Sequence, residues 1–531
     1  MKPFRKTLIT HYMLTRRDFM FWLAALFTLL LASIILSPLA NAWFHRDDFW
    51  LITLSRYTSN PIDFWLHDHS AFYFFRPFAM SLWWYTVAWW GVEAAPHYAV
   101  NALLHVLVAI TLGLWIRIFT RSWSTGFVAI VIYTAHPITV RTAMWLSDRF
   151  DLLASACVFA ACALFISDTG VRWRRFGLLA LSVGAFFSKE TGLTLLAPVT
   201  LHWLFRRNDN SVRSSQMTGD LIMIAALALI AVVWRVTLLS GRGIPFADAA
   251  ISQTLAEGVS IYLRAFSNAA FGVFAMGSAL GIALSFAVLA AFVVWSVRVL
   301  IFPVERKTLE AYCVGLALWL ACLVLHAPIA LQNLGGAALA SYGPSLRVFH
   351  LALAAPLVMA CAPLLNAMHG VRMAVVRLII FCAMGLVAAA SIQSNQFVRQ
   401  WVTETNGPTK TVVTSTVKLI VEQSLPDMCK IVVSGASTIA PDFLAASDVM
   451  IKAMAPIATH NLLRCVLVTE RSPHFALVHK DVCSRDHWLP LRPVHPLVQP
   501  HVFGKLCYEF FTTPDRTLLS NDPRTVWINT P

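Results

Sequence analysis

The chain has 531 residues, of which 58% are hydrophobic and only 13% are charged, with a formal net charge of +14. A typical soluble domain has about 25% charged residues. Apolar runs of about 18 residues or more, the length that a helix needs to cross a bilayer, recur from Phe19 to Ser391. The sequence therefore excludes an ordinary soluble domain and predicts an α-helical polytopic membrane protein. The basic residues cluster in short loops between apolar runs, as the positive-inside rule expects, which argues against nucleic-acid binding.

The segment 2–17 is basic and is expected to stay in the cytoplasm. The apolar run that follows, over 19–42, is too long for a signal-peptide core and lacks a convincing small-residue cleavage site, so it predicts a retained helix. This helix leads outward to the sequence W-F-H-R-D-D-F-W, which contains the adjacent carboxylates Asp47 and Asp48. The first outer loop, 43–96, is dense in Trp, Phe and Tyr, which suits the headgroup layer. We expect amphipathic helices on the outer leaflet there, including one over 77–90 that lies on it or dips into it.

The apolar pattern predicts about eleven spans, whose basic ends fall on one side. The residues expected inside are Arg117, Arg121, Arg172, Arg174, Arg175, Arg206, Arg207, Arg298, Arg306 and Lys307. The segment 208–220 is expected to be a hydrophilic cytoplasmic loop. The segments 136–151, 188–190 and 332–347 are expected outside.

The pattern changes near residue 395, where β-branched and alternating stretches begin. The stretches 411–420, 430–434 and 474–480 are typical of strands. Together they predict a transmembrane domain over 1–394 and a small soluble α/β domain over 395–531, outside the membrane by parity. Cys429, Cys465, Cys483 and Cys507 could pair there in three ways, and the sequence does not choose among them. The other six cysteines lie in apolar runs and are expected to be core residues.

Polar side chains recur at the predicted outer ends of the spans. Ionisable groups at membrane depth cost several kcal/mol unless they pair or face water, so these side chains predict a cavity open to the outside. An alternative for His97, Asn101 and His105, which share one helix face, is interhelical hydrogen bonding that holds the bundle. The predicted cavity residues are Arg76, His97, Asn101, His105, His136, Arg141, Asp148, Arg149, Asp151, Lys189, Glu190 and Arg347, together with the Asp pair.

Five motifs occur in order over about residues 43–200: H-R-D-D, F-R-P-F, H-Y-A-V-N-A-L-L-H, A-H-P-I-T-V-R-T-A-M-W-L-S-D-R-F-D-L-L-A and F-S-K-E-T-G-L-T-L-L. This series resembles the GT-C membrane glycosyltransferases. It is most similar to the protein O-mannosyltransferase branch, which includes the transmembrane tetratricopeptide-repeat mannosyltransferases. Arg141 stands where the family usually has an acidic residue after His-Pro, and no tetratricopeptide repeats follow.

The resemblance implies an inverting transferase that moves a sugar from a polyprenyl-phosphate donor, within the membrane lipid, to an acceptor at the outer face. Asp47 would be the general base, and Asp48 would orient the acceptor or help to hold a metal. Lys189 and Arg347 would bind the donor phosphate. A divalent cation is the only cofactor suggested, and its ligands are not identified. The chain looks bacterial, so we expect the inner membrane, with the site and the C-terminal domain in the periplasm. The acceptor would be an envelope glycan, a glycolipid or a protein.

Two other functions fit the same composition. The first is a transporter or flippase of lipid-linked sugars, although no internal duplication is found. The second is a non-catalytic membrane scaffold. At individual positions the alternatives are structural: a solvated loop for the Asp pair, interfacial anchoring for Arg141 and Arg149, and a local ion pair for Lys189 and Glu190.

Overall fold

The structure, a computed structural model, describes two compact units of the chain. The bundle unit comprises Met1–Ser37, Val100–Trp234 and Phe246–Val398, and the loop unit comprises Pro38–Ala99, Arg235–Pro245 and Arg399–Pro531. The described residues within them are 19, 21–45, 47–66, 75–207, 212–239, 290, 293–299, 301–332, 350–361, 388–422, 430–434, 454, 466–469, 476–479, 506–509 and 525–529.

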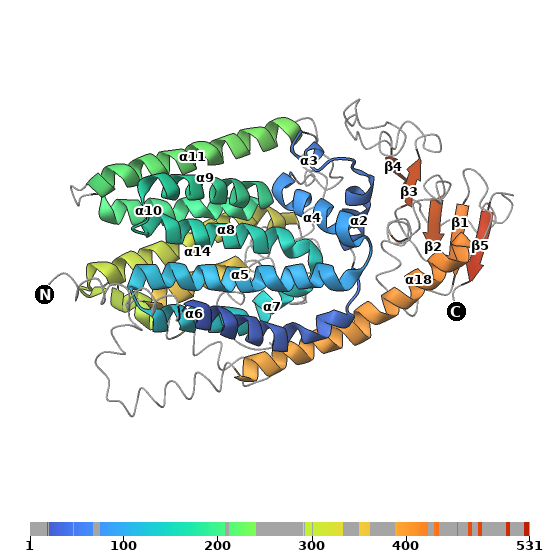
Figure 1. The fold of residues 1–531 in the computed structure, drawn as a ribbon, viewed down its shortest axis with the longest axis horizontal. Helices are drawn as coiled ribbons and strands as arrows, with labels where there is room; N and C mark the ends of the chain where they lie inside the picture. Colours follow the sequence, from blue (N-terminus) through green and yellow to red (C-terminus); the bar gives the residue numbers. More distant parts are fainter. Residues whose placement is uncertain are drawn as a thin grey trace, which may run out of the picture. The chain divides into compact units, whose positions relative to one another are not determined.

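The bundle unit is built from long helices around α8 (Arg149–Ile166). α8 packs against α9 (Val171–Ser188), against the 3-10 helix η3 (Glu190–Leu195) and against α10 (Leu196–Arg206). α10 and η3 also contact α14 (Arg306–Gln332), and these helices run side by side (Figure 1). The other described elements are α5 (Ala94–Thr120), which begins in the loop unit, α6 (Trp123–Ala135), α7 (Pro137–Met144), η2 (Leu146–Asp148) and α11 (Val212–Leu239).

Five described helices are long and apolar enough to cross a membrane: Phe21–Asn41, Ala94–Thr120, Leu146–Ile166, Ser214–Leu238 and Arg306–Leu325. α6 and α7 would form a sixth span with a 57° bend at their junction. The bend falls at His136-Pro137, because Pro137 has no N–H to continue the ladder of α6 and instead occupies the first turn of α7. Large apolar side chains such as Leu229 and Val236 of α11 are exposed, as they would be toward lipid. Two further predicted spans correspond to α9 and α10, which are described but are not both long and apolar enough to be counted, and the others fall largely outside the described residues.

Two expectations about local structure are wrong. The predicted loop 208–220 is mostly helical, since α11 already begins at Val212. The predicted strand 411–420 is part of the helix α18 (Gly407–Val421), which continues a helix over 388–401 through a π-helical turn, η5 (Val402–Asn406). The hydroxyls of Thr411 and Thr414 donate to carbonyls four residues earlier, and Val412 is buried. These contacts satisfy the β-branched residues within a helix, which overrides their weak strand preference.

The loop unit contains the helices expected in the first outer loop. α2 (Asp47–Tyr57) and α3 (Asp63–Leu66) pack against α4 (Pro77–Trp90). The Trp84 indole donates to the Thr58 carbonyl at 2.7 Å, and the Trp65 indole donates to the Ser81 hydroxyl at 3.1 Å. The aromatic residues of this loop therefore tie its short helices together, in addition to any role at a membrane surface.

Strands occur at two of the three predicted places, β1 (Lys430–Ser434) and β3 (Ala476–His479). β1 lies between β2 (Val466–Thr469) and β5 (Thr525–Asn529) in a three-stranded parallel sheet. β3 pairs with β4 (Leu506–Glu509) in antiparallel register. The domain boundary at 395 stays a prediction.

The structure tests the core positions predicted for some cysteines but not the pairing predicted for the four near the C-terminus. Cys162, Cys322 and Cys361 are buried, as expected of core residues, whereas Cys157 and Cys313 are only partly buried. Cys429, Cys465 and Cys483, as well as the side chain of Cys507, lie outside the described residues, so their predicted pairing is not tested.

Candidate functional site

A cluster of buried charged groups lies where α8 begins. It consists of two cations, Arg149 and Lys189, and two carboxylates, Asp148 and Asp151, all at most 6% exposed. We call these four residues the buried charge cluster. The cluster contains equal numbers of positive and negative groups, and pairing between opposite charges offsets the large cost of burying them. All four were predicted as cavity residues from the sequence.

Lys189 and Asp151 form an ion pair across 38 residues of sequence. Lys189 follows the last residue of α9, and Asp151 lies in the first turn of α8. The turn after Lys189 is held close to α9 by Gly192, where a Cβ atom would lie 2.1 Å from the Ala185 carbonyl oxygen. The sequence motif S-K-E-T-G therefore has a structural basis: its glycine permits the approach that brings the lysine to the carboxylate.

Arg149 is fully buried and donates from Nε to the Asn101 side-chain oxygen at 3.0 Å. Asn101 in turn donates to the Trp145 carbonyl at 3.0 Å and to the Ala143 carbonyl at 3.4 Å. One amide thus joins α5 to the end of α7 and to the start of α8. The alternative of interfacial anchoring for Arg149 is wrong, because the side chain has no exposed surface.

The other predicted residues of the bundle unit have largely structural contacts. The His105 imidazole bonds the Thr134 carbonyl at 3.1 Å, which joins α5 to α6. His136 caps α7, its Nδ1 accepting from the Ile138 N–H at 3.2 Å. The Arg141 guanidinium lies 4.4 Å from the centre of the Phe397 ring. Glu190 is the first residue of η3 and is partly buried. Lys189 forms its ion pair with Asp151 and not with the adjacent Glu190.

In the loop unit, Asp48 has a capping role. Its carboxylate is buried and accepts from the His45 N–H at 2.8 Å, while the Asp48 N–H donates to the His45 carbonyl at 2.9 Å. These two bonds close the turn from which α2 starts. Asp47 is the first residue of α2, and its side chain lies outside the described residues. The catalytic roles expected for Asp47 and Asp48 stay predictions.

The backbone just before the Asp pair is held by side chains from distant parts of the chain. The Asn406 amide accepts from the Trp43 N–H and donates to the Trp43 carbonyl and, at 3.4 Å, to the Phe44 carbonyl. The Tyr98 hydroxyl also donates to the Trp43 carbonyl, at 2.8 Å. We call Asn406 and Tyr98 the Trp43 clamp. Asn406 lies in the π-helical turn η5, a kind of irregularity that is frequent at functional sites.

The two remaining predicted residues of the loop unit are also buried. His97 is enclosed by aromatic rings, stacked on Trp83 at 5.7 Å between ring centroids and bonded to the Gly91 carbonyl at 3.1 Å. Gly91 has φ +56°, in the left-handed region that favours glycine. Arg76 precedes Pro77 at the start of α4 and is 9% exposed. Asn101 and His105 thus make contacts of the kind expected from the structural alternative, whereas His97 bonds within the loop unit, and the cavity role of all three stays a prediction.

Each unit therefore gathers its own subset of the predicted residues. The bundle unit holds Asn101, His105, His136, Arg141, Asp148, Arg149, Asp151, Lys189 and Glu190, and the loop unit holds Asp47, Asp48, Arg76 and His97. Arg347, predicted to bind phosphate, lies outside the described residues. Among the residues that are described, no group of three or more His, Cys, Asp or Glu side chains could hold a metal ion.

Several buried polar contacts among the described residues were not predicted from the sequence, including the ion pair of Arg174 with Asp220 at 2.8 Å. The Asn406 contact to Trp43 has no local sequence signal. The Ser155 hydroxyl lies 2.9 Å from the imidazole of the buried His350. His202 pairs with Glu310 at 2.8 Å, joining α10 to α14. Glu310 and His202 are ionisable residues near long apolar runs, a signal that could have identified them.

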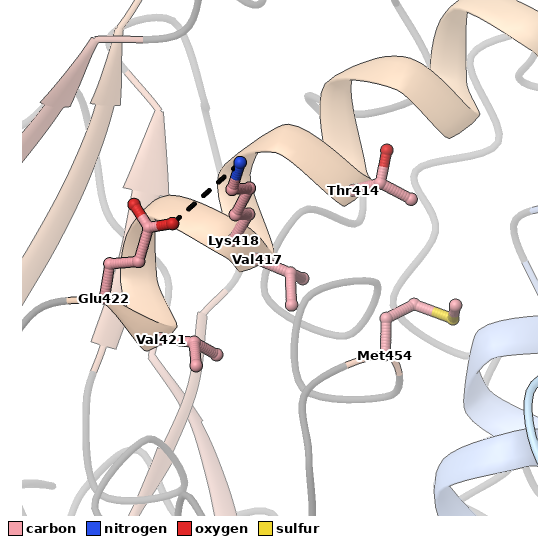
Figure 2. A pocket seen from close by; sticks show the side chains of 6 residues that line it. All are labelled: Thr414, Val417, Lys418, Val421, Glu422 and Met454. Carbon is pink, nitrogen blue, oxygen red and sulfur yellow. Dashed lines mark ion pairs between the residues drawn. The ribbon is translucent and has the colours of Figure 1, made fainter.

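A small pocket of about 330 Å³ lies along α18 (Figure 2). Its polar side chains include Lys418 and Glu422, which form an exposed ion pair at 4.0 Å, one helical turn apart. The other lining side chains are Thr414, Val417, Val421 and Met454. This is a solvated surface hollow without buried charge, unlike the cluster at the start of α8.

The described helices and their exposed apolar faces define a multi-pass α-helical membrane protein. No protein-family model matches the chain, and no curated protein matches it. Among solved structures, it is similar to the Archaeoglobus fulgidus oligosaccharyltransferase in complex with Zn and sulfate, with 13% identity and a TM-score of 0.42 over 81% of this chain and 61% of that one. It is also similar to ArnT from Cupriavidus metallidurans bound to undecaprenyl phosphate, with 14% identity and a TM-score of 0.35 over 84% and 92% of the two chains. The chain thus spans less than two thirds of the oligosaccharyltransferase, and similarity at this level does not assign a function.

Proposed function

We propose that this protein is a membrane glycosyltransferase that moves one sugar from a polyprenyl-phosphate carrier to an acceptor at the outer face of the membrane. The observation that carries the proposal is the buried charge cluster around the Asp151–Lys189 pair, within a bundle of apolar helices. Ionisable groups so placed are costly and mark functional sites in membrane proteins. The five motifs that resemble the GT-C glycosyltransferases include every member of this cluster.

The proposed reaction is a single displacement with inversion. The Asp47 carboxylate takes the proton of an acceptor hydroxyl as the oxygen attacks the anomeric carbon, and the bond from that carbon to the carrier phosphate breaks. The products are the glycosylated acceptor, the protonated carboxyl group and the free polyprenyl phosphate. Asp48 fixes the start of α2 through its bond from the His45 N–H, and in this proposal it thereby holds the backbone that carries Asp47. The Trp43 clamp holds the preceding peptide in the same way.

The donor phosphate needs cations that are fixed in place. Lys189 has three N–H donors, and the contact with Asp151 occupies only one side of the ammonium group. In this proposal the Asp151 carboxylate fixes the position of the Lys189 ammonium group, and the remaining N–H donors of that group bind the phosphate. Arg347 is the second proposed phosphate ligand, since a guanidinium group can donate two parallel hydrogen bonds to phosphate oxygens.

The proposal is tested first in cells and then with purified protein. Mass spectrometry of envelope glycans from a deletion strain is expected to show one missing sugar and its attachment point. The purified protein, given that sugar on a polyprenyl phosphate and the identified acceptor, should transfer it, and Asp47→Asn should abolish transfer. Asp63→Asn, a matched change in α3 of the same unit, should leave transfer intact.

Undiminished turnover in the Asp47→Asn variant would contradict the assignment of the base. A purified protein that moves the lipid-linked sugar across vesicles but never transfers it would instead support the flippase. Unchanged envelope glycans in the deletion strain would support the scaffold.

A further inference from the structure

A cavity with a charged lining opens where five segments of the bundle unit each have one of their ends. Its volume is about 440 Å³, within the range of ligand sites. Its walls come from the ends of α5, α8 and α10 and from the first turns of α11 and α14. The sequence places all of these ends on the cytoplasmic side, opposite the predicted outer segments. The charged lining residues are Arg121, Arg206, Arg306, Lys307, Asp168 and Glu310.

On one wall of this cavity, positive and negative side chains are paired in fixed contacts. Glu310 is buried and accepts from Arg206 at 3.3 Å and from His202 at 2.8 Å. The Trp115 indole donates to His202 Nε2 at 3.2 Å, which leaves His202 Nδ1 to carry the proton given to Glu310. This chain of contacts fixes the Arg206 guanidinium at the cavity wall and offsets its charge.

The other cations leave the cavity with an excess of positive charge. Arg121 and Lys307 are exposed and form no ion pair with the residues that the structure describes. With four cations and two carboxylates, the lining has a net charge of +2. Arg121 also has φ 59°, a left-handed conformation that is uncommon outside glycine. Arg121 directly follows the last residue of α5, and a left-handed residue at this position is a common way for a helix to end.

We propose that this cavity binds the phosphate headgroup of an anionic membrane lipid in the adjoining leaflet. The charged rim suits a phosphate, to which Arg donates two hydrogen bonds and Lys a point charge. The apolar part of the lining, from Ile118, Phe119, Ile166, Phe205 and Met217, suits the start of the acyl chains. Basic pockets between transmembrane helices on the cytoplasmic side are known to bind phosphate-bearing headgroups. This inference is independent of the proposed transferase activity.

The test uses the delipidated full-length protein in detergent and native mass spectrometry with added phosphatidylglycerol or phosphatidylcholine. The wild type should bind phosphatidylglycerol at least about 10-fold more tightly than phosphatidylcholine, given the contribution of each cation near a headgroup. The double change Arg121→Gln with Lys307→Gln should weaken phosphatidylglycerol binding about 30-fold and leave phosphatidylcholine binding unchanged. Both side chains are exposed, so the variant should fold, and Lys307→Arg should retain binding.

The control is Arg172→Gln, which removes an exposed cation from the start of α9 outside the cavity and should change binding less than about 2-fold. Equal affinity of the wild type for the two lipids would overturn the proposal. So would an equal loss of binding in the control variant. Full displacement of the lipid by millimolar inorganic phosphate would also overturn it, since the site would then serve a soluble anion.

Discussion

Removing the ammonium group of Lys189 tests whether its interaction with Asp151 stabilises the fold as strongly as the burial of both side chains implies. In Lys189→Met the side chain keeps its approximate length, but the buried Asp151 carboxylate loses its ion pair with the ammonium group. The two side chains of the pair are only 6% and 2% exposed, so solvent replaces little of the lost interaction. Breaking one partner of a buried pair costs about 3–5 kcal/mol.

The double variant Lys189→Met with Asp151→Asn removes both charges and should recover much of that loss. A coupling energy of about 2 kcal/mol or more is therefore expected between the two positions. The measurement is the free energy of unfolding in mixed detergent micelles, taken for the two single variants, the double variant and the wild type.

The matched control is the exposed pair on α18. Lys418 and Glu422 are 77% and 59% exposed at 4.0 Å, so Lys418→Met should change stability by less than about 0.5 kcal/mol. A Lys189→Met variant that is no less stable than this control would refute the reasoning, as would a double variant that is less stable than both single variants.

Two further predictions concern close contacts. Gly192→Ala should destabilise the protein by about 1–3 kcal/mol, because its Cβ would overlap a backbone carbonyl of α9, whereas Gly170→Ala, with nothing within 4 Å, should have little effect in the same unfolding measurement. Asn406→Ala should cost about 1–3 kcal/mol, since it leaves the buried Trp43 N–H without its acceptor. Tyr98→Phe should cost less, because the Trp43 carbonyl keeps the Asn406 donor. Equal losses at Gly192 and Gly170, or a larger loss at Tyr98 than at Asn406, would contradict these assignments.

Segment ends that the sequence assigns to one side of the membrane meet at one end of the bundle unit, and the identity of that side stays a prediction. Residues from five segments that the sequence places on one side, among them Arg121, Arg206 and Lys307, line one cavity at one end of the bundle. Basic ends of apolar runs are a local feature of the sequence, so the alternation of spans can be followed without knowing any contact. The strand predicted over 411–420 is wrong because its conformation depends on contacts that are not local in the sequence. Strand preference is weak there, and the adjoining helix and the burial of Val412 decide the outcome.

The sequence by itself determined that the chain is a membrane protein, where most of its described helices lie, and which polar motifs are exceptional in so apolar a chain. These features depend on composition and short-range periodicity. Only the tertiary structure decided the partners: Lys189 with Asp151, Arg149 with Asn101, and Asn406 with Trp43, which are 38, 48 and 363 residues apart. A carboxylate or an amide has the same sequence signature whether it is catalytic, capping or paired. Its role is set by which groups the fold brings within hydrogen-bonding distance, and that distance is unrelated to separation along the chain.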